Sequence, residues 1–91
     1  MRLSTRRFYY VYIILNRTQQ AWYSGITADI NATASNAGVS GVTSLLYLEV
    51  YSDTSAAIAR EQEISRMSDR KKTALVRSKN PELRDITGQV S

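Results

Sequence analysis

The chain has 91 residues, a length that allows one modest hydrophobic core and not two independent ones. It contains no cysteine and no histidine, which excludes disulfides, thiol chemistry, a structural zinc site and a histidine general base. Twelve Lys and Arg against eight Asp and Glu give a formal net charge of +4, which favours a polyanionic partner. No stretch approaches the roughly 18 to 20 apolar residues that cross a bilayer, so we expect a cytoplasmic protein with no membrane partner.

The first half of the chain predicts a hairpin followed by weaker structure. Phe8–Leu15 is dense in aromatic and β-branched residues, which indicates a strand. The polar stretch Asn16–Gln20 separates it from a second strand, Ala21–Ile26, and this short connection predicts an antiparallel pair. Ile30–Asn36 predicts only a weak helix because Asn, Thr and Ser occupy its interior, and Ala37–Thr43, with two glycines, indicates a loop.

The second half predicts one strand and two helices. Ser44–Tyr51 has the composition of a third strand, and the side chains of Ser52-Asp53-Thr54 can cap a helix over Ser55–Met67. Ser68-Asp69 can cap a second helix over Arg70–Ser78. This helix must end before Pro81, because proline disfavours helical backbone at the preceding residue.

These elements predict a single α+β domain over residues 8–86, with flexible tails at 1–7 and 87–91. The expected order is β-β-α-β-α-α, with helices packed against one small three-stranded antiparallel sheet.

Glu61 is the most informative position on physical grounds. On its predicted helix it lies in the middle of a mostly apolar stripe formed by Ala57, Ile58, Ile64 and Ser68. A desolvated, unpaired carboxylate costs several kcal/mol, so Glu61 must be paired or must bind a cation. The pattern leaves three alternatives open: an ion pair with a nearby arginine, a helix rotated to expose the carboxylate, and a metal or catalytic role.

Tyr12 and Tyr23 lie on the two strands of the predicted hairpin. If the strands pair so that the residue numbers of each cross-strand pair sum to 35, Tyr12 and Tyr23 are neighbours whose hydroxyls point the same way. We then expect the two hydroxyls and the Glu61 carboxylate to meet in one shallow cleft. For any strand tyrosine, however, amphipathic core packing is an alternative.

Five blocks in a fixed order carry a resemblance to a known family. They are Tyr10-Val11-Tyr12, Tyr23 to Ile30, Ala57 to Glu61, Ser68 to Val76 and Asn80 to Ile86. In this order they resemble the paired tripeptides, the G-x-T-x-D-L run and the carboxy-terminal half of the GIY-YIG nuclease superfamily, in particular its small stand-alone bacterial members.

The resemblance implies a GIY-YIG-like domain that hydrolyses DNA phosphodiester bonds with one divalent metal, Mg²⁺ or Mn²⁺, and no small-molecule cofactor. By position, Tyr12 and Tyr23 match the family tyrosines that activate or place the attacking water. Glu61 matches the metal-binding glutamate, and Asn80 matches an asparagine that supports the site. An oxygen-ligand site with one carboxylate suits these two metals.

The sequence departs from the family at three places. The family arginine that stabilises phosphate charge is replaced by Thr33, a histidine found in many members is replaced by Ala37, and the following loop lacks basic and aromatic residues. Losing one such cation costs on the order of 10² to 10³ in rate. We therefore expect weak cleavage at best, unless Arg17, Arg60 or a partner protein supplies the missing charge.

The carboxy-terminal third contains a basic cluster that suggests a second interpretation. Its members are Arg66, Arg70, Lys71, Lys72, Arg77 and Lys79. A cluster of cations like this one can hold a phosphate backbone, so the alternative function is a catalytically inactive module that binds nucleic acid without cutting. The cluster is also compatible with a solvated helix face on a domain that binds a protein partner.

Overall fold

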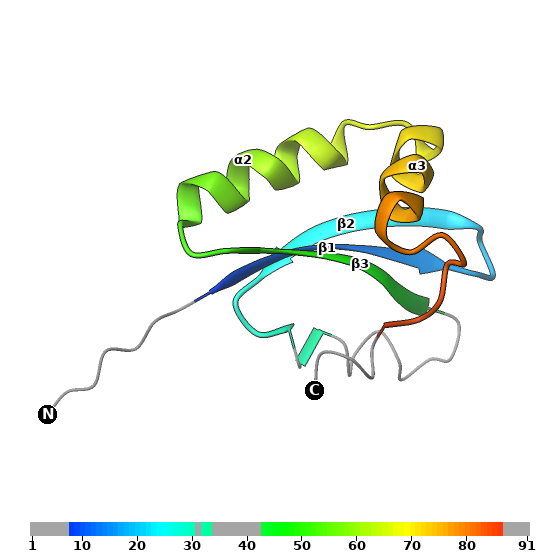
Figure 1. Cartoon of the computed structure of the whole chain (residues 1–91), viewed down its shortest axis with the longest axis horizontal. Coiled ribbons are helices and arrows are strands. Elements are labelled where there is room, and N and C mark those ends of the chain that lie inside the picture. The colour runs from blue at the N-terminus through cyan, green and yellow to red at the C-terminus, as the bar shows by residue number, and fades with distance from the viewer. Residues whose placement is uncertain (1–7, 31, 34–42, 87–91) are drawn as a thin grey trace, which may run out of the picture.

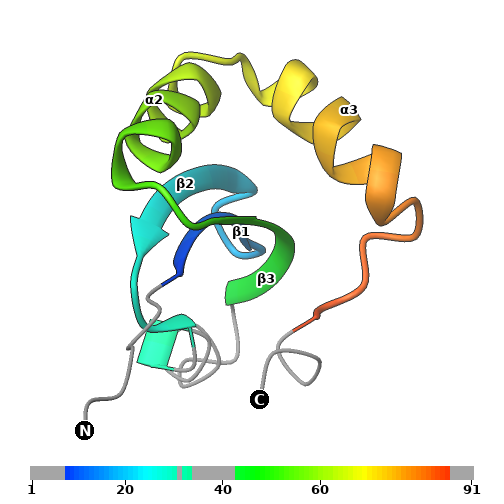
Figure 2. The ribbon, with the colours of Figure 1, turned by 60° about the vertical axis from the view of Figure 1, so that its left-hand side comes forward.

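A computed structural model of the chain describes residues 8–30, 32–33 and 43–86. Its elements are, in chain order, β1 (Tyr9–Asn16), β2 (Ala21–Thr27), β3 (Thr43–Tyr51), α2 (Thr54–Ser65) and α3 (Asp69–Lys79) (Figure 1). The strands form an antiparallel sheet in the order β2-β1-β3, and α2 and α3 lie on one face of it, which we call the helix face (Figures 1 and 2). The predicted α+β class with a three-stranded antiparallel sheet is confirmed.

The described elements follow the order β-β-β-α-α, because the predicted first helix is described only in part. Ile30, Ala32 and Thr33 have helical backbone, and a side-chain oxygen of Asp29 accepts from the backbone N–H of Ala32 at 3.1 Å, as a cap does. The rest of the predicted helix over 30–36, most of the loop over 37–43 and both predicted tails lie outside the described residues.

The register of the hairpin differs from the assumed one by two residues. Tyr12 pairs with Gly25 and Ile14 pairs with Tyr23, so partner numbers sum to 37 and not to 35. The difference arises in the turn, where the Asn16 side chain accepts from the backbone N–H of Gln19 at 3.0 Å and Gln20 adopts a left-handed φ of 56°. These features close a four-residue turn between Asn16 and Ala21; with Asn16 still the last paired residue, a sum of 35 would leave a turn of two residues.

Alternation along β1 divides the apolar residues between the two faces of the sheet. Val11 and Ile13 point to the helix face and pack in one cluster with residues of both helices, including Ala57 and Val76; all four are fully buried. Tyr10, Tyr12 and Ile14 alternate with these two residues along β1, so they point to the opposite face, where they pack around Leu45 and Ile30. An irregularity in the β1–β3 pairing between Ile13 and Ile14 lets both Leu46 and Tyr47 join the cluster on the helix face.

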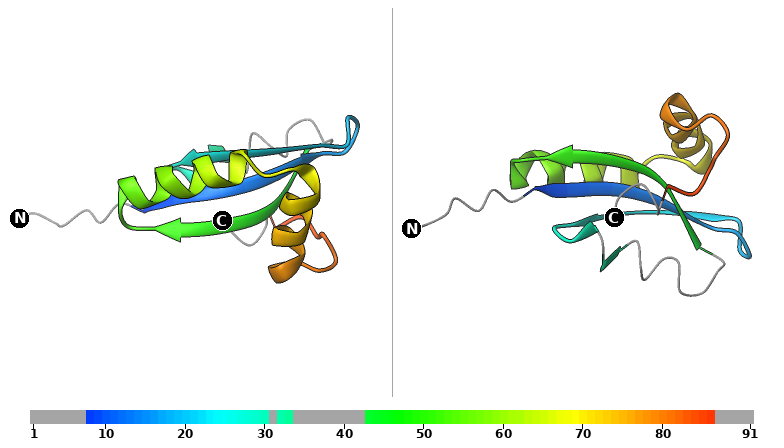
Figure 3. Two further views of the ribbon diagram at one scale, coloured as in Figure 1. Left: turned by 90° about the horizontal axis from the view of Figure 1, so that it is seen from above. Right: turned by 60° about the horizontal axis from the view of Figure 1, so that its bottom comes forward.

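The helix ends follow the predicted chemistry. Asp53 caps α2 by accepting from the backbone N–H of Ala56 at 3.0 Å, and Ser68 caps α3 by accepting from that of Lys71 at 3.2 Å. α3 ends at Lys79, two residues before Pro81. Seen from above the sheet, α2 runs along the strands whereas α3 turns across their end (Figure 3).

The segment after α3 passes around the free edge of β3. Leu83 packs on the helix-face cluster, and Ile86 packs on the cluster of the opposite face. The backbone N–H of Ile86 donates to the carbonyl of Leu45 at 2.8 Å, so this segment covers part of the β3 edge.

Candidate functional site

Glu61 lies on the side of α2 that faces the sheet, between the fully buried Ala57 and Ile64. Its carboxylate is half-buried, and the Oγ of Ser24 on β2 donates to its Oε2 at 3.2 Å. Within the described part of the chain, neither of its oxygens has an ion pair. The sequence left open an ion pair with an arginine and a helix rotated to expose the carboxylate. The described residues show neither arrangement.

The two tyrosines leave the sheet from the other face. Tyr12 is two residues from Ile14 on β1, and Tyr23 is the cross-strand partner of Ile14, so all three side chains point to the same face of the sheet. Ile14 belongs to the cluster on the face opposite α2. Tyr23 is 48% exposed, and its hydroxyl donates to the Oε1 of Gln19 at 3.1 Å. The expectation that both hydroxyls and the Glu61 carboxylate meet in one shallow cleft is therefore wrong, because the sheet separates them.

All three side chains nevertheless approach one tripeptide of β2. Tyr23 belongs to it, Ser24 contacts Glu61 from the helix face, and Gly25 contacts the Tyr12 ring from the opposite face. A Cβ on Gly25 would overlap the phenol Cζ and Oη of Tyr12, so only glycine leaves room for that ring. Because β2 is an edge strand, a ligand at its free edge can meet groups from both faces.

Asn80 connects elements near the end of the domain. Its Nδ2 donates to the carbonyls of Leu46 at 2.9 Å and Arg84 at 2.8 Å, and its Oδ1 accepts from the Arg84 backbone N–H at 3.0 Å. The amide thus joins the end of α3, strand β3 and the segment that returns along the β3 edge. This is a supporting role, and it is located on the side of the sheet away from β2.

The two arginines considered as replacements for the missing cation have other partners. The Nε of Arg17 donates to Ser44 Oγ at 2.9 Å, near the β1–β3 pair. Arg60 pairs with Glu49 at 2.9 Å and with Glu63 at 2.8 Å. Thr33 offers no charge, and its hydroxyl donates to the backbone carbonyl of Asp29 at 3.1 Å.

A half-buried polar network on the helix face was missed by the sequence reasoning. Glu49 on β3 accepts from the hydroxyls of Tyr47 at 2.5 Å and Tyr51 at 2.6 Å, and from the Arg60 guanidinium on α2. The signal was present as Tyr-x-Glu-x-Tyr, because residues two apart on a strand point to the same face. Core packing, the alternative for any strand tyrosine, does not predict these hydrogen bonds.

The network changes the pKa values of its members. Burial alone would raise the pKa of Glu49, but the hydrogen bonds from Arg60, Tyr47 and Tyr51 outweigh it and lower that pKa to about 2. Burial and the hydrogen bond to Glu49 raise the pKa of Tyr47 to about 12. Glu49 is therefore ionised and Tyr47 neutral over the physiological pH range. These are the protonation states in which the Tyr47 hydroxyl donates to the Glu49 carboxylate and stabilises the fold.

The predicted basic cluster is exposed except at one position. Arg66, Arg70, Lys71, Arg77 and Lys79 are exposed. Lys72 is only 8% exposed, because it precedes the fully buried Val76 by one helical turn and so faces the sheet. Lys72 is therefore not part of the exposed basic surface on which a phosphate contact depends.

Comparison of the chain with models of protein families, with curated proteins and with solved structures gave no match. Among the described residues, no three or more Asp and Glu side chains gather in a group that could hold a metal ion. In the same part of the chain, no helix is long and apolar enough to span a membrane. The case for a function therefore depends on the motif resemblance and on the geometry around Glu61.

Proposed function

We propose that the chain is a GIY-YIG-type endonuclease domain that hydrolyses DNA phosphodiester bonds with one divalent metal. The observation that carries the proposal is the Glu61 carboxylate, half-buried at the β2 edge and without an ion pair among the described residues. Leaving such a group desolvated and unpaired costs free energy that a bound cation recovers. The ordered motifs from Tyr10 to Ile86 supply the reaction class.

The donor set around Glu61 fits a hard divalent cation. Oε2 accepts one hydrogen bond from Ser24, and Oε1 has no partner in the described part of the chain. One carboxylate that leaves most coordination positions to water and substrate phosphate is typical of Mg²⁺ and Mn²⁺ sites. When bound, the metal supplies Lewis-acid stabilisation of charge on the phosphate.

The remaining residues at the edge orient the substrate and the attacking water. Gln19 holds the exposed hydroxyl of Tyr23, and Gly25 lets the Tyr12 phenol lie across β2. A phenol hydroxyl fixed in this way can accept a hydrogen bond from water and direct it towards a phosphate at the same edge. The exposed cations of α3 hold the flanking backbone by charge, whatever its sequence.

We propose that the activity is weak, because the charge that forms on the phosphate lacks its usual partner. Thr33 replaces the family arginine, and Arg60 is already paired with two carboxylates. Drawing Arg60 away would leave the half-buried Glu49 carboxylate with its two tyrosine hydrogen bonds but without an ion pair, which is costly. The same observation favours the second candidate function, an inactive module of this fold that binds nucleic acid or a protein partner without cutting.

Metal binding can be measured independently of cleavage. We expect Mn²⁺, followed by the loss of its free electron paramagnetic resonance signal, to bind the wild type at least about tenfold more tightly than Glu61→Gln. The amide keeps an acceptor for Ser24 and removes the charge, so the fold should be unaffected. Glu63→Gln, on the same helix, is the matched control and should bind as the wild type does. Equal Mn²⁺ binding by all three proteins would contradict the proposed site.

A further inference from the structure

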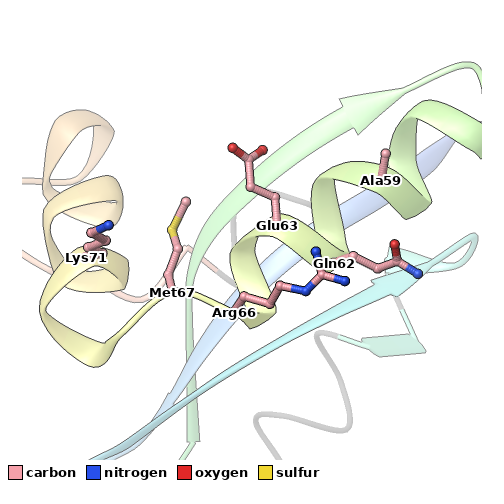
Figure 4. A pocket seen from close by; sticks show the side chains of 6 residues that line it. All are labelled: Ala59, Gln62, Glu63, Arg66, Met67 and Lys71. Atoms are coloured by element: carbon pink, nitrogen blue, oxygen red, sulfur yellow. The ribbon is translucent and has the colours of Figure 1, made fainter.

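A hollow lies on the outer side of the helices, where α2 meets α3. It is open to solvent, has a volume of about 530 Å³ and is lined by Ala59, Gln62, Glu63, Arg66, Met67 and Lys71. Figure 4 shows Met67 between Lys71 on α3 and the side chains at the end of α2. This volume is within the range of about 300 to 1,000 Å³ that is usual for small-molecule sites.

The charges that line this hollow favour an anion. Arg66 and Lys71 are exposed and form no ion pair with any described residue. The Glu63 carboxylate also lines the hollow, and it shares its partner Arg60, at 2.8 Å, with Glu49, so it offsets part of this positive charge. The lining therefore carries two exposed cations against one carboxylate, which leaves it net positive.

The uncharged residues that line the hollow suit the base of a nucleotide, just as its cations suit a phosphate. Met67 is partly buried against the helix-face cluster and presents a polarisable thioether, and Ala59 adds apolar surface. The Gln62 side chain is exposed, and it forms no hydrogen bond with a described residue. An amide offers both donors and an acceptor, which suits the edge of an unpaired base.

We propose that this hollow binds one unpaired nucleotide of a single-stranded segment, with the two phosphates that flank the nucleotide held by Arg66 and Lys71 and its base placed over Met67 beside Gln62. A base stacked inside a duplex cannot enter, so the occupant is a single strand or a single-stranded branch. Glu61 faces the sheet from the other side of α2, roughly 10 Å away across a helix. The hollow therefore holds a flanking strand and not the phosphodiester that is cut, and this inference rests on the nucleic-acid binding of the proposed function.

The test compares a fluorescein-labelled oligothymidine 12-mer with a duplex of the same length by fluorescence anisotropy. We expect Arg66→Ala with Lys71→Ala to weaken single-strand binding at least about tenfold and to reduce its salt slope by about 1.4, since each lost phosphate contact removes about 0.7. Gln62→Ala should weaken single-strand binding about threefold to fivefold, leave the salt slope unchanged and spare the duplex. Arg84→Ala, which removes an exposed cation outside both α3 and the hollow, is the control and should change single-strand affinity less than threefold.

The outcomes separate this inference from the proposed function. Equal losses in the Arg84 control and in the Arg66 and Lys71 variant, or equal losses for single strand and duplex, would show a general cationic surface and overturn the inference alone. Poly-L-glutamate bound as tightly as the oligonucleotide, and weakened equally by Gln62→Ala, would overturn it in favour of an acidic protein partner. A wild type that binds neither DNA at low salt would overturn both the inference and the proposed function.

Discussion

Thr33→Arg is expected to increase Mg²⁺-dependent nicking of supercoiled plasmid at least about tenfold, which corresponds to about 1.4 kcal/mol of activation free energy. The wild type has no cation at this position, and the arginines examined as replacements have other partners. A guanidinium is planar, always charged and able to bind two phosphate oxygens, so it can stabilise charge that forms during cleavage.

Two further variants identify the origin of the gain. Thr33→Lys carries the same charge without the planar fork and should give a smaller increase. Thr33→Arg combined with Glu61→Gln should lose the gain, because the added cation assists only a reaction that depends on the metal site. An increase that survives Glu61→Gln would mean that the new arginine acts by binding DNA and not at the reacting phosphate.

Glu49→Gln is expected to reduce the free energy of unfolding by about 3 kcal/mol at neutral pH. The Glu49 side chain is 12% exposed, and its pKa is lowered from 4.5 to about 2 in the folded protein, which at 1.36 kcal/mol per pKa unit gives this order of magnitude. Gln resembles the protonated carboxyl group, so the substitution removes what ionisation contributes. Urea denaturation measures the loss, and Glu63→Gln, whose carboxylate is 64% exposed, should cost less than about 0.5 kcal/mol.

The same network predicts a pH dependence with a definite sign. Because folding lowers the pKa of Glu49, its contribution is fully present above pH 4.5, decreases below that value and is lost as the pH falls through about 2. Glu49→Gln should therefore reduce the slope of stability against pH in this acidic window. An unchanged slope would show that Glu49 is not held by its partners in solution.

Local sequence patterns predicted the strands, the helices and their ends. They did not predict which residues pair across the sheet or between a helix and a strand. Capping at Asp53 and Ser68, the end of α3 before Pro81 and the inward position of Glu61 all follow from short-range rules. The hairpin register did not, because it depends on the left-handed backbone of Gln20, which no residue preference required. An error of two residues preserved the faces of the sheet and misplaced the cross-strand partner of Tyr12.

The charged residues showed the same limitation. The sequence showed that Lys72 belongs to a basic row, but its burial depends on how α3 is rotated against the sheet. The ion pair of Arg60 with Glu49 joins a helix to a strand 11 residues away, so neither residue alone indicated its partner. Tertiary packing, and not local composition, decides which cations remain available for a phosphate.

The most direct test of the account is Mg²⁺-dependent nicking of supercoiled plasmid by the wild type, Glu61→Gln and Glu63→Gln. We expect slow nicking by the wild type that stops on chelation, loss of at least about 10²-fold in Glu61→Gln and wild-type rates in Glu63→Gln. Nicking by the wild type that persists unchanged in Glu61→Gln, or that needs no divalent metal, would contradict the assignment of Glu61 as the metal ligand at the β2 edge.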